Sequence, residues 1–409
     1  MKENKEKVWP GYKSTKLGWI PEEWELVKIR DVTIVGNGTT PSRNNKEYWE
    51  KGTIPWLPTG KVNEIEIHHA DEFITQKALE ETSLKLLPIN TVLIGMIGQG
   101  KTRGMAAIMK LEATVNQNFA YLISKDGLHS MFLFNKLTFD YKLLRGSGRG
   151  GGQESLNCSI IKNYKIPLPP LPEQQKIATI LSNWDKTIEK LGLLIEAKEQ
   201  KKKGLMQRLL TGKVRVKRFN NDWIERSLGE IFKERKERSF GNLELLSIGA
   251  EGVYPQSNSN KKDNSNSDKS KYKRICPGDI GYNTMRMWQG RSAVSRLEGI
   301  VSPAYTIITP KDEVDVNYMG YLFQLPKTIH TFWRYSQGLV SDTLNCKFPS
   351  FAKIKVVIPP SKEEQEKIAK IIQVAEQEIQ TIKDKRDLFI EQKKGLMQRL
   401  LTGKVRVNL

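Results

Sequence analysis

One feature limits the fold of this chain more than any other: a segment near its middle is repeated at its end. Lys202–Val216 occurs a second time, letter for letter, as Lys393–Val407, and the two copies lie 191 positions apart. The same spacing relates Glu173-Gln174 to Glu364-Gln365 without a gap. One unit of about half the chain is therefore used twice, and the fold and function must be ones that a duplicated unit can supply.

The residues around each copy predict a long helix. Apolar residues recur there at alternating intervals of four and three, which is typical of a coiled-coil seam. A helix of about 38 residues spans roughly 57 Å and cannot leave such a stripe in water. We expect the two helices to pack antiparallel on each other and to bind partner helices through the same residues. These are Ile177, Leu181, Trp184, Ile188, Leu191, Ile368, Ile372, Ile379, Ile382 and Phe389.

Proline and glycine mark the ends of both predicted helices. The proline-rich stretches Ile166–Pro172 and Val357–Pro360 end a strand-like run before each helix, because proline continues neither a helix nor a central strand. Gly212 and Gly403 follow each helix as C-cap residues. The predicted division is a globular block at 1–166, a spacer helix at 167–211, a second block at 212–357 and a second spacer helix at 358–409.

The two blocks are predicted to be related α+β domains. Both contain short β-like runs and glycine-rich turns, and they begin and end alike: Trp24 parallels Trp223, and Leu156-Asn-Cys158 parallels Leu344-Asn-Cys346. Between these marks the sequences diverge, so we expect two versions of one mixed α/β domain with different specificities. If the tail around Val405-Arg-Val407 packs beside the start of the chain, the arrangement is quasi-circular with a pseudo-twofold axis.

The charge of the chain favours a polyanionic partner. The formal net charge is +20 and the pI is about 9.6, a balance common in proteins that bind nucleic acid, although a soluble basic protein without such a partner is the alternative. Three widely spaced cysteines favour a reducing, cytoplasmic compartment over a disulfide framework or a zinc site. Neither a signal peptide nor a membrane-spanning run of about 18 apolar residues is expected.

Several motifs resemble enzyme sites but lack the context that those sites require. Gly95–Thr102 matches the phosphate-binding loop GxxxxGK[ST], yet a β-like run follows it where a helix is required. Gly146–Gly151 matches GxGxxG, but no helix is expected after it. The pair His68-His69 is interpreted as solvated surface rather than a metal site. We find no catalytic set, no metal site and no cofactor site in the sequence.

The remaining candidate chemistry is the binding of nucleic acid. Arginine and lysine bind phosphates and guanine, and asparagine and glutamine can bind adenine in the major groove. The first block offers such residues on a glycine-rich loop and on a turn, and the second block offers a basic cluster around a tryptophan. Packing and turn capping are the alternative roles. The candidates for DNA contact are Gln99, Lys101, Arg103, Asn116, Gln117, Tyr282, Asn283, Arg286, Trp288, Gln289 and Arg291.

These features together resemble the specificity (S) subunits of type I restriction–modification systems, over essentially the whole chain. The resemblance rests on the order block, helix, block, helix and on the doubled GLMQRLLTGKV. It rests also on IPLPPLPEQQKIA at 166–178 and IPPSKEEQEKIA at 358–369, and on the interior motifs Gly98–Gly104 and Met285–Gly290, which are similar to those of target recognition domains.

The resemblance implies a function without catalysis in this chain. Each block would be a target recognition domain that reads one half of a split double-stranded DNA site, while the helices would set the unread spacer. Two methyltransferase (M) subunits would bind the helices and use S-adenosylmethionine to methylate adenine N6, and restriction (R) subunits would hydrolyse ATP with Mg²⁺. No cofactor is expected in this chain itself.

Charged residues interrupt the predicted seam at Lys198, Lys202, Arg386 and Lys393. A buried unpaired charge is costly, so we expect partner helices to supply acids there, or the seam to open to solvent. Two other functions compete with the S-subunit interpretation. One is a nucleotide-binding enzyme that uses Gly95–Thr102, and the other is a coiled-coil scaffold that does not read DNA.

Overall fold

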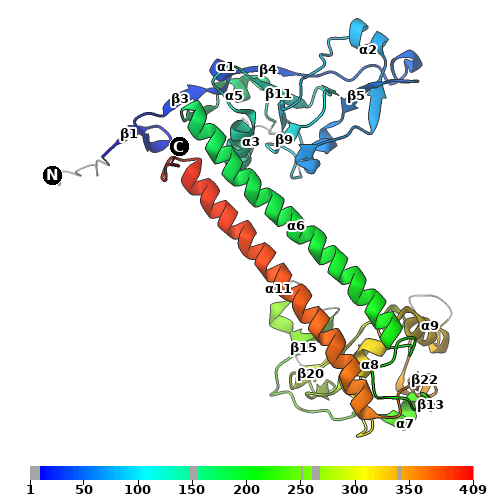
Figure 1. Cartoon of the computed structure of the whole chain (residues 1–409). Helices are drawn as coiled ribbons and strands as arrows, with labels where there is room; N and C mark the ends of the chain where they lie inside the picture. The colour runs from blue at the N-terminus through cyan, green and yellow to red at the C-terminus, as the bar shows by residue number, and fades with distance from the viewer. Residues whose placement is uncertain are drawn as a thin grey trace. The chain divides into compact units, whose positions relative to one another are not determined.

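The chain folds into two units that are interleaved along the sequence. The computed structural model describes residues 10–98, 100–147, 155–249, 252–259, 268–338 and 343–408. Unit 1 comprises Met1–Leu191 and Lys385–Leu409, and unit 2 comprises Gly192–Asp384. Each unit therefore contains a sheet domain, one half of the first long helix and one half of the second (Figure 1).

The central sheets of the two units share one frame of four antiparallel strands. In unit 1 the order is β4, β11, β8, β9, with β6 added in parallel at the edge, and in unit 2 it is β14, β21, β18, β19. The bounds are Thr33–Asn37 (β4), Phe119–Ser124 (β11), Val92–Gly95 (β8), Ala106–Met109 (β9), Glu66–Ile67 (β6), Phe232–Glu234 (β14), Tyr305–Pro310 (β21), Ile280–Asn283 (β18) and Ser292–Val294 (β19).

The register of these sheets agrees strand by strand. Val92 opens β8 and pairs with Ile108, and Ile280 opens β18 and pairs with Val294. Buried aliphatic residues fill β8, β9 and β11, as expected of strands covered on both faces. The prediction of two similar mixed α/β domains is confirmed by this shared frame.

The parts around the frames differ between the units. Unit 1 adds the hairpin β1–β2, the sheet β10-β5-β7 and helix α2, while unit 2 adds the pairs β15–β16 and β17–β20. The bounds are Tyr12–Thr15 (β1), Gly18–Pro21 (β2), Thr114–Val115 (β10), Ile54–Leu57 (β5), Glu72–Ile74 (β7), Gln76–Glu81 (α2), Leu246–Gly249 (β15), Gly252–Pro255 (β16), Lys273–Ile275 (β17) and Gly299–Val301 (β20).

The first and last strands of each sheet domain pair with each other. β3 pairs antiparallel with β12 in unit 1, and β13 pairs antiparallel with β22 in unit 2, so each domain closes where the chain leaves for a long helix. Short helices complete both domains. The bounds are Glu25–Lys28 (β3), Lys165–Leu168 (β12), Ile224–Ser227 (β13), Lys355–Ile358 (β22), Ile29–Val32 (α1), Ser130–Phe139 (α3), Tyr141–Gly146 (α4), Cys158–Asn163 (α5), Leu228–Ile231 (α7), Val316–Leu322 (α8), Pro326–Tyr335 (α9) and Phe348–Ala352 (α10).

Two long helices, α6 (Leu171–Leu209) and α11 (Lys362–Leu400), follow the last strands, and each has 39 residues (Figure 1). Both end in the same way. Gly212 and Gly403 adopt a φ of 72°, a left-handed conformation that favours glycine, and an amide two residues further on returns to the last helical turn. The predicted glycine caps are therefore present. None of the helices in the described residues is long and apolar enough to cross a membrane.

Within each unit the two helix segments pack antiparallel. In unit 1 the rings of Trp184 and Phe389 lie 5.1 Å apart, and Met397 and Leu400 join the core that contains Leu181. Residues later in α6 contact residues earlier in α11, so the two segments run antiparallel. In unit 2 the ion pairs of α6 with α11 follow the same direction.

The seam lysines pair with acids of the chain itself, which corrects the expectation that partner helices supply them, while the seam is partly open to solvent there, as the other alternative expects. Lys393 Nζ lies 2.5 Å from Asp185 in unit 1, and Lys202 Nζ lies 3.1 Å from Glu376 in unit 2. Lys198 pairs with Glu378, while Arg386 pairs with its neighbour Asp387. Both helices carry carboxylates at the matching turns, so the chain neutralises its own seam.

Half of the residues predicted to bind partner helices are covered by the chain itself. Ile177, Leu181, Ile368 and Ile372 are buried in the units' own cores, and this corrects their assignment to a partner surface. Ile379 is 5% exposed but belongs to neither core, and its role in partner binding stays a prediction. Trp184, Ile188, Leu191, Ile382 and Phe389 keep part of their surface, and their role in partner binding stays a prediction. The sequence pattern missed the apolar side chains that are most exposed on the helices: Leu193, Leu194, Val374, Leu388 and Ile390.

The C-terminal tail packs beside the start of the chain in unit 1. Tyr12 Oη donates a hydrogen bond of 3.0 Å to the carbonyl of Gly403. Arg406 bonds the buried carboxylate of Glu173 at 2.7 and 2.9 Å and reaches Glu23 at 2.6 Å. The segment that contains Tyr12 and Glu23 therefore meets the segment after α11, as the predicted quasi-circular arrangement requires.

Candidate nucleic-acid interface

The sequence candidates gather at one end of equivalent hairpins in the two units. The loop from β8 to β9 carries Lys101 and Arg103, and the loop from β18 to β19 carries Arg286, Trp288 and Arg291. We call these two loops, residues 96–105 and 284–291, the tips. Gln99 lies outside the described residues.

The tip of unit 1 connects two antiparallel strands and is not built as a nucleotide-binding loop. The amide of Gly104 donates to the carbonyl of Gly95 at 2.8 Å, and the amide of Gly95 donates to Met105 at 3.0 Å. Strand β9 begins at Ala106, where a phosphate-binding loop requires the start of a helix. The match of Gly95–Thr102 to that motif is therefore not accompanied by its structure.

The candidates of unit 1 divide into exposed and structural side chains. Lys101 and Gln117 are exposed, and Gln117 accepts a hydrogen bond of 2.5 Å from Thr40. Asn116 is buried, and its side-chain amide forms hydrogen bonds with the hydroxyl of Thr59 and the backbone amide of Asn118. Arg103 is 9% exposed. Asn116 therefore stabilises the turn. The interface in this unit depends on Lys101, Gln117 and the small exposed part of Arg103.

In unit 2 most candidates lie at the surface of the tip, but Tyr282 does not. Its side chain is 0% exposed and stacks on Phe351 with the ring centroids 5.3 Å apart, and burial raises the pKa of its phenol well above the ordinary value. Tyr282 is therefore a core residue, which corrects its assignment to DNA. The apolar β-like run around it is the sequence signal for this core position.

A short one-turn 3₁₀ helix, Met287–Gln289, presents the other candidates of unit 2. Trp288 Nε1 donates to the carbonyl of Met285 at 2.9 Å, and Asn283 Oδ1 accepts from the amide of Met285 at 3.0 Å. The side chains of Arg286, Gln289 and Arg291 are exposed. Guanidinium groups held on a rigid turn suit the fixed geometry of phosphates and base edges.

Each tip rests on a short helix. In unit 1 Tyr141 Oη of α4 donates to the carbonyl of Lys101 at 2.9 Å, and Arg145 donates to that of Arg103 at 3.3 Å. In unit 2 α9 packs on the tip, where a Cβ on Gly290 would lie 2.7 Å from the side chain of Ile329.

The same helices carry exposed aromatic and basic side chains beside the tips. Trp333 is 49% exposed on α9, beside the exposed residues Arg334 and Tyr335. The signal that could have found them is the aromatic–basic composition of Tyr141–Arg145 and Phe332–Tyr335, which follows each hairpin in sequence.

The tips present donor groups suited to binding. In the part of the chain that the structure describes, no group of three or more His, Cys, Asp and Glu residues is placed to hold a metal ion. His68 and His69 are exposed, and each lies near a single carboxylate, Glu66 at 3.5 Å and Asp71 at 3.8 Å. Cationic donors on two separate tips can hold phosphates and read base edges.

Known proteins resemble the chain along its whole length. The family profile described as type I restriction modification DNA specificity domain matches twice, at residues 21–199 and 220–392. The type I restriction enzyme MjaIX specificity subunit of Methanocaldococcus jannaschii is 38% identical over 185 residues, which cover 44% of this chain and 41% of that protein. The putative MjaX specificity subunit of the same organism is 26% identical over 97% of both chains.

Solved structures share the fold. The S subunit of a type I restriction–modification system from M. genitalium aligns with a TM-score of 0.55 at 16% identity, over 92% of this chain and 96% of that one. The HsdS subunit from Thermoanaerobacter tengcongensis aligns with a TM-score of 0.52 at 15% identity, over 94% and 98%. The doubled sheet frame, the long helices and the two matches of the family profile lead to one conclusion: this chain belongs to the family of type I restriction–modification specificity subunits.

Proposed function

We propose that this chain is the DNA sequence-recognition subunit of a type I restriction–modification complex, in which the tip of each unit reads one half of a split, asymmetric site. The observation that carries the proposal is a contrast between frame and tip. Equivalent hairpins with the same register hold different side chains, Lys101 and Arg103 in one unit and Arg286, Trp288 and Arg291 in the other. Equal frames with unequal tips suit two half-sites of different sequence.

The chemistry belongs to partner subunits in this proposal. Two methyltransferase subunits bind the helices and supply S-adenosylmethionine, and restriction subunits with ATP and Mg²⁺ join through them. The chain itself is not an enzyme, and the complex works on DNA in the cytoplasm. One structural relative comes from work on complex assembly and conformational transition of the type I system, which supports a role in assembly.

The helices fix the unread spacer between the half-sites. A helix advances about 1.5 Å per residue and B-DNA about 3.4 Å per base pair, so seven added residues correspond to roughly three base pairs. Blocks 1–166 and 212–357 would then act as target recognition domains, and 167–211 and 358–409 as spacer helices. A seven-residue insertion in both α6 and α11 should lengthen the spacer without changing either half-site.

Methylome sequencing tests the proposal directly. A host that expresses this chain with its neighbouring methyltransferase is compared with a host that lacks only this chain. We expect one split N6-methyladenine motif to depend on the chain. Replacing residues 212–357 with the second block of another S subunit should change one half of that motif and leave the other half intact.

Methylome sequencing and an ATP-binding measurement together separate the proposal from its two rivals. An unchanged methylome would leave the coiled-coil scaffold as the better description of the helices. ATP binding by the chain that is lost in Lys101→Ala would favour the nucleotide-binding enzyme. The loop closed by Gly95 and Gly104, which leads directly into β9, argues against that second outcome.

A further inference from the structure

A second surface is duplicated in the two units, and it lies where each sheet domain meets a long helix. Unit 1 has a cavity of about 480 Å³ there and unit 2 has one of about 660 Å³; we call them groove 1 and groove 2. Groove 1 is lined on α6 by Thr179, Ser182, Asn183 and Lys186. Groove 2 is lined on α11 by Lys370, Gln373, Val374 and Gln377, the same four positions shifted by 191.

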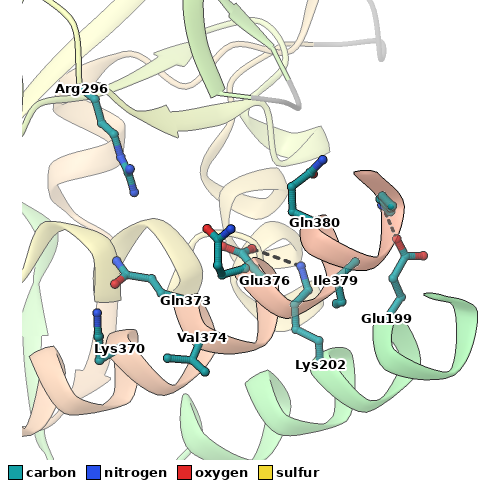
Figure 2. Close-up of a pocket in the computed structure, with 11 residues that line it drawn as sticks. Glu199, Lys202, Arg296, Lys370, Gln373, Val374, Glu376, Ile379 and Gln380 are labelled. Atoms are coloured by element: carbon teal, nitrogen blue, oxygen red, sulfur yellow. Dashed lines mark hydrogen bonds and ion pairs between the residues drawn. The ribbon is translucent and has the colours of Figure 1, made fainter. Parts of the chain in front are cut away.

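The wall opposite the helix is also equivalent, and it carries a cation in both units. Ile108 pairs with Val92 and Val294 pairs with Ile280, so the residues two positions further, Lys110 and Arg296, occupy the same place in the two sheets. Lys110 lines groove 1 and Arg296 lines groove 2. Figure 2 shows Arg296 extending from the sheet domain toward the helix that bears Lys370 and Gln373.

The two grooves carry the same excess of charge. Groove 1 is lined by Lys110 and Lys186 and by no carboxylate. Groove 2 is lined by four cations and two carboxylates, and Glu376 and Glu199 are already paired with Lys202 at 3.1 Å and Lys383 at 2.6 Å (Figure 2).

Two cations therefore remain in each groove, one from the hairpin and one from the helix. Lys110 and Lys186 remain in groove 1, and Arg296 and Lys370 remain in groove 2. Within the described ranges none of these four side chains forms an ion pair with a carboxylate of the chain; Lys110 makes only a long contact of 3.5 Å with Asn90.

The position of the grooves separates them from the tips. Lys110 and Arg296 follow β9 and β19, whereas the tips precede these strands, and a strand of four residues spans roughly 13 Å. Apolar side chains accompany the cations: Met131 and Leu128 line groove 1, and Val374 lines groove 2 with 57% of its surface exposed. A DNA backbone offers phosphates but no apolar surface, whereas an acidic amphipathic helix offers both carboxylates and apolar side chains.

We infer that each groove binds one acidic amphipathic segment of a protein partner, so that one chain binds two copies of the same partner at equivalent places. The hairpin cations Lys110 and Arg296 are equivalent, whereas the helix cations Lys186 and Lys370 stand at different positions of the repeat. This inference rests on the proposed function, because it assigns the binding surface of the methyltransferase subunit and the chemistry of the segment that occupies it. Carboxylates of the segment pair with one hairpin cation and one helix cation, and the apolar side chains of the segment cover the nearby aliphatic side chains.

The test uses the full chain co-expressed with its neighbouring methyltransferase and counts bound copies by native mass spectrometry. The groove 1 variant is Lys110→Glu with Lys186→Glu, and the groove 2 variant is Arg296→Glu with Lys370→Glu. Each should weaken the binding of one copy by on the order of tenfold or more and convert the two-copy complex into a one-copy complex. The fourfold variant should lose both copies. Added salt should weaken the wild-type complex in the same direction.

Matched controls carry the same charge change on the same helices outside the grooves. As a double variant, Lys190→Glu on α6 with Lys394→Glu on α11 matches the charge change of each groove variant at exposed lysines that line neither groove, and it should retain two copies. If a charge-reversed variant fails to fold, the glutamine substitutions at the same four positions carry the test, with an expected loss of about threefold per groove.

Two results would overturn the inference. One is an unchanged affinity for both copies in every groove variant. The other is an unchanged copy number with weaker binding to a DNA duplex that lacks the recognition site, which would assign the grooves to phosphates. Either result leaves the methylated motif dependent on this chain, whereas failure of the proposed function removes that motif whatever the grooves bind.

Discussion

The two units close around the same buried carboxylate but obtain the closing arginine from different parts of the chain. In unit 2 Arg215, which follows α6 without a break, bonds Glu364 at 2.9 and 3.1 Å. In unit 1 Arg406 in the C-terminal tail bonds Glu173 at 2.7 and 2.9 Å. The duplication therefore repeats the contact together with the sequence, because Arg215 and Arg406 are equivalent positions of the repeat, as are Glu364 and Glu173.

In each unit a tryptophan also bonds this carboxylate, and we call the carboxylate, the arginine and the tryptophan the lock of the unit. Trp24 Nε1 donates to Glu173 at 2.9 Å and is fully buried, while Trp223 Nε1 donates to Glu364 at 3.4 Å and is partly exposed. The locks are alike and the tips are unlike. The comparison teaches that the parts that hold each unit together are held constant, while the parts that we propose meet DNA vary.

The largest expected effect comes from removing the shared carboxylates. Glu173→Ala and Glu364→Ala each leave an arginine and an indole without their acceptor, which should cost the affected unit about 3 kcal/mol of unfolding free energy. Hydrogen exchange in β3 and β12, against β13 and β22, reports each unit separately. The equivalence of the locks fails if one substitution loosens its unit and the other costs less than about 1 kcal/mol.

Removing the arginines sharpens the comparison between a tail and an internal segment. Arg215→Ala and Arg406→Ala leave the carboxylate bonded only to tryptophan, and each should cost about 2 kcal/mol because a buried charge loses its bonds. Equal losses show that the tail is held as firmly as the internal segment. A loss near zero for Arg406→Ala alone would show that the chain end frays and that unit 1 is stable without it.

The proposed difference between the tips predicts effects confined to one half of the recognised site. Lys101→Ala should weaken binding to the half read by unit 1, and Arg286→Ala should weaken binding to the half read by unit 2. Each should cost about 1.5 kcal/mol, or roughly tenfold, if the side chain contacts a base or phosphate. Binding is measured on duplexes with one half-site scrambled. A loss of equal size on both scrambled duplexes for either variant would contradict the assignment of one half to each unit.

The sequence predicted the fold well because the repeat and the helix signals are local. The 191-residue spacing, the proline stops and the caps Gly212 and Gly403 each constrain a few neighbouring residues, and the structure has them where they were expected. The seam lysines were misassigned because their acids Asp185 and Glu376 lie on the other helix. Only the relative register of the helices brings them together, and no local pattern encodes it.

The candidate interface was less predictable for a related reason. Polarity in the sequence cannot separate a side chain that reads DNA from one that shapes a turn: Asn116 and Gln117 are neighbours, yet the first is buried and the second exposed. Tyr282 shows the converse, because its side chain carries a polar hydroxyl but belongs to the core. Trp333 was missed because α9 comes next to the tip only through the tertiary fold.

The smallest expected effect concerns one position where the units differ on an identical backbone. His129 precedes α3 with φ −83° and ψ 119°, and Asp315 precedes α8 with φ −84° and ψ 125°. Both backbone amides donate to the equivalent glutamines Gln174 and Gln365 at 2.9 Å. Asp315 also caps its helix by accepting from the amide of Tyr318 at 2.7 Å, whereas His129 supplies no cap. We predict that His129→Asp stabilises unit 1 by about 1 kcal/mol at pH 7.5.

The gain from His129→Asp should increase as the pH falls. Burial, followed by the nearby Lys110, lowers the pKa of His129 below its ordinary value of 6.5, so protons bind the unfolded chain more readily and wild-type stability declines below about pH 6.5. The aspartate has no such loss until its own carboxyl group protonates at about pH 4. Urea unfolding of unit 1, followed by hydrogen exchange at pH 7.5 and 5.5, measures both parts, and Asp315→His should destabilise unit 2 by a similar amount. A gain that is absent at both pH values would show that the N-terminus of α3 is already satisfied and that the two positions are equivalent in backbone only.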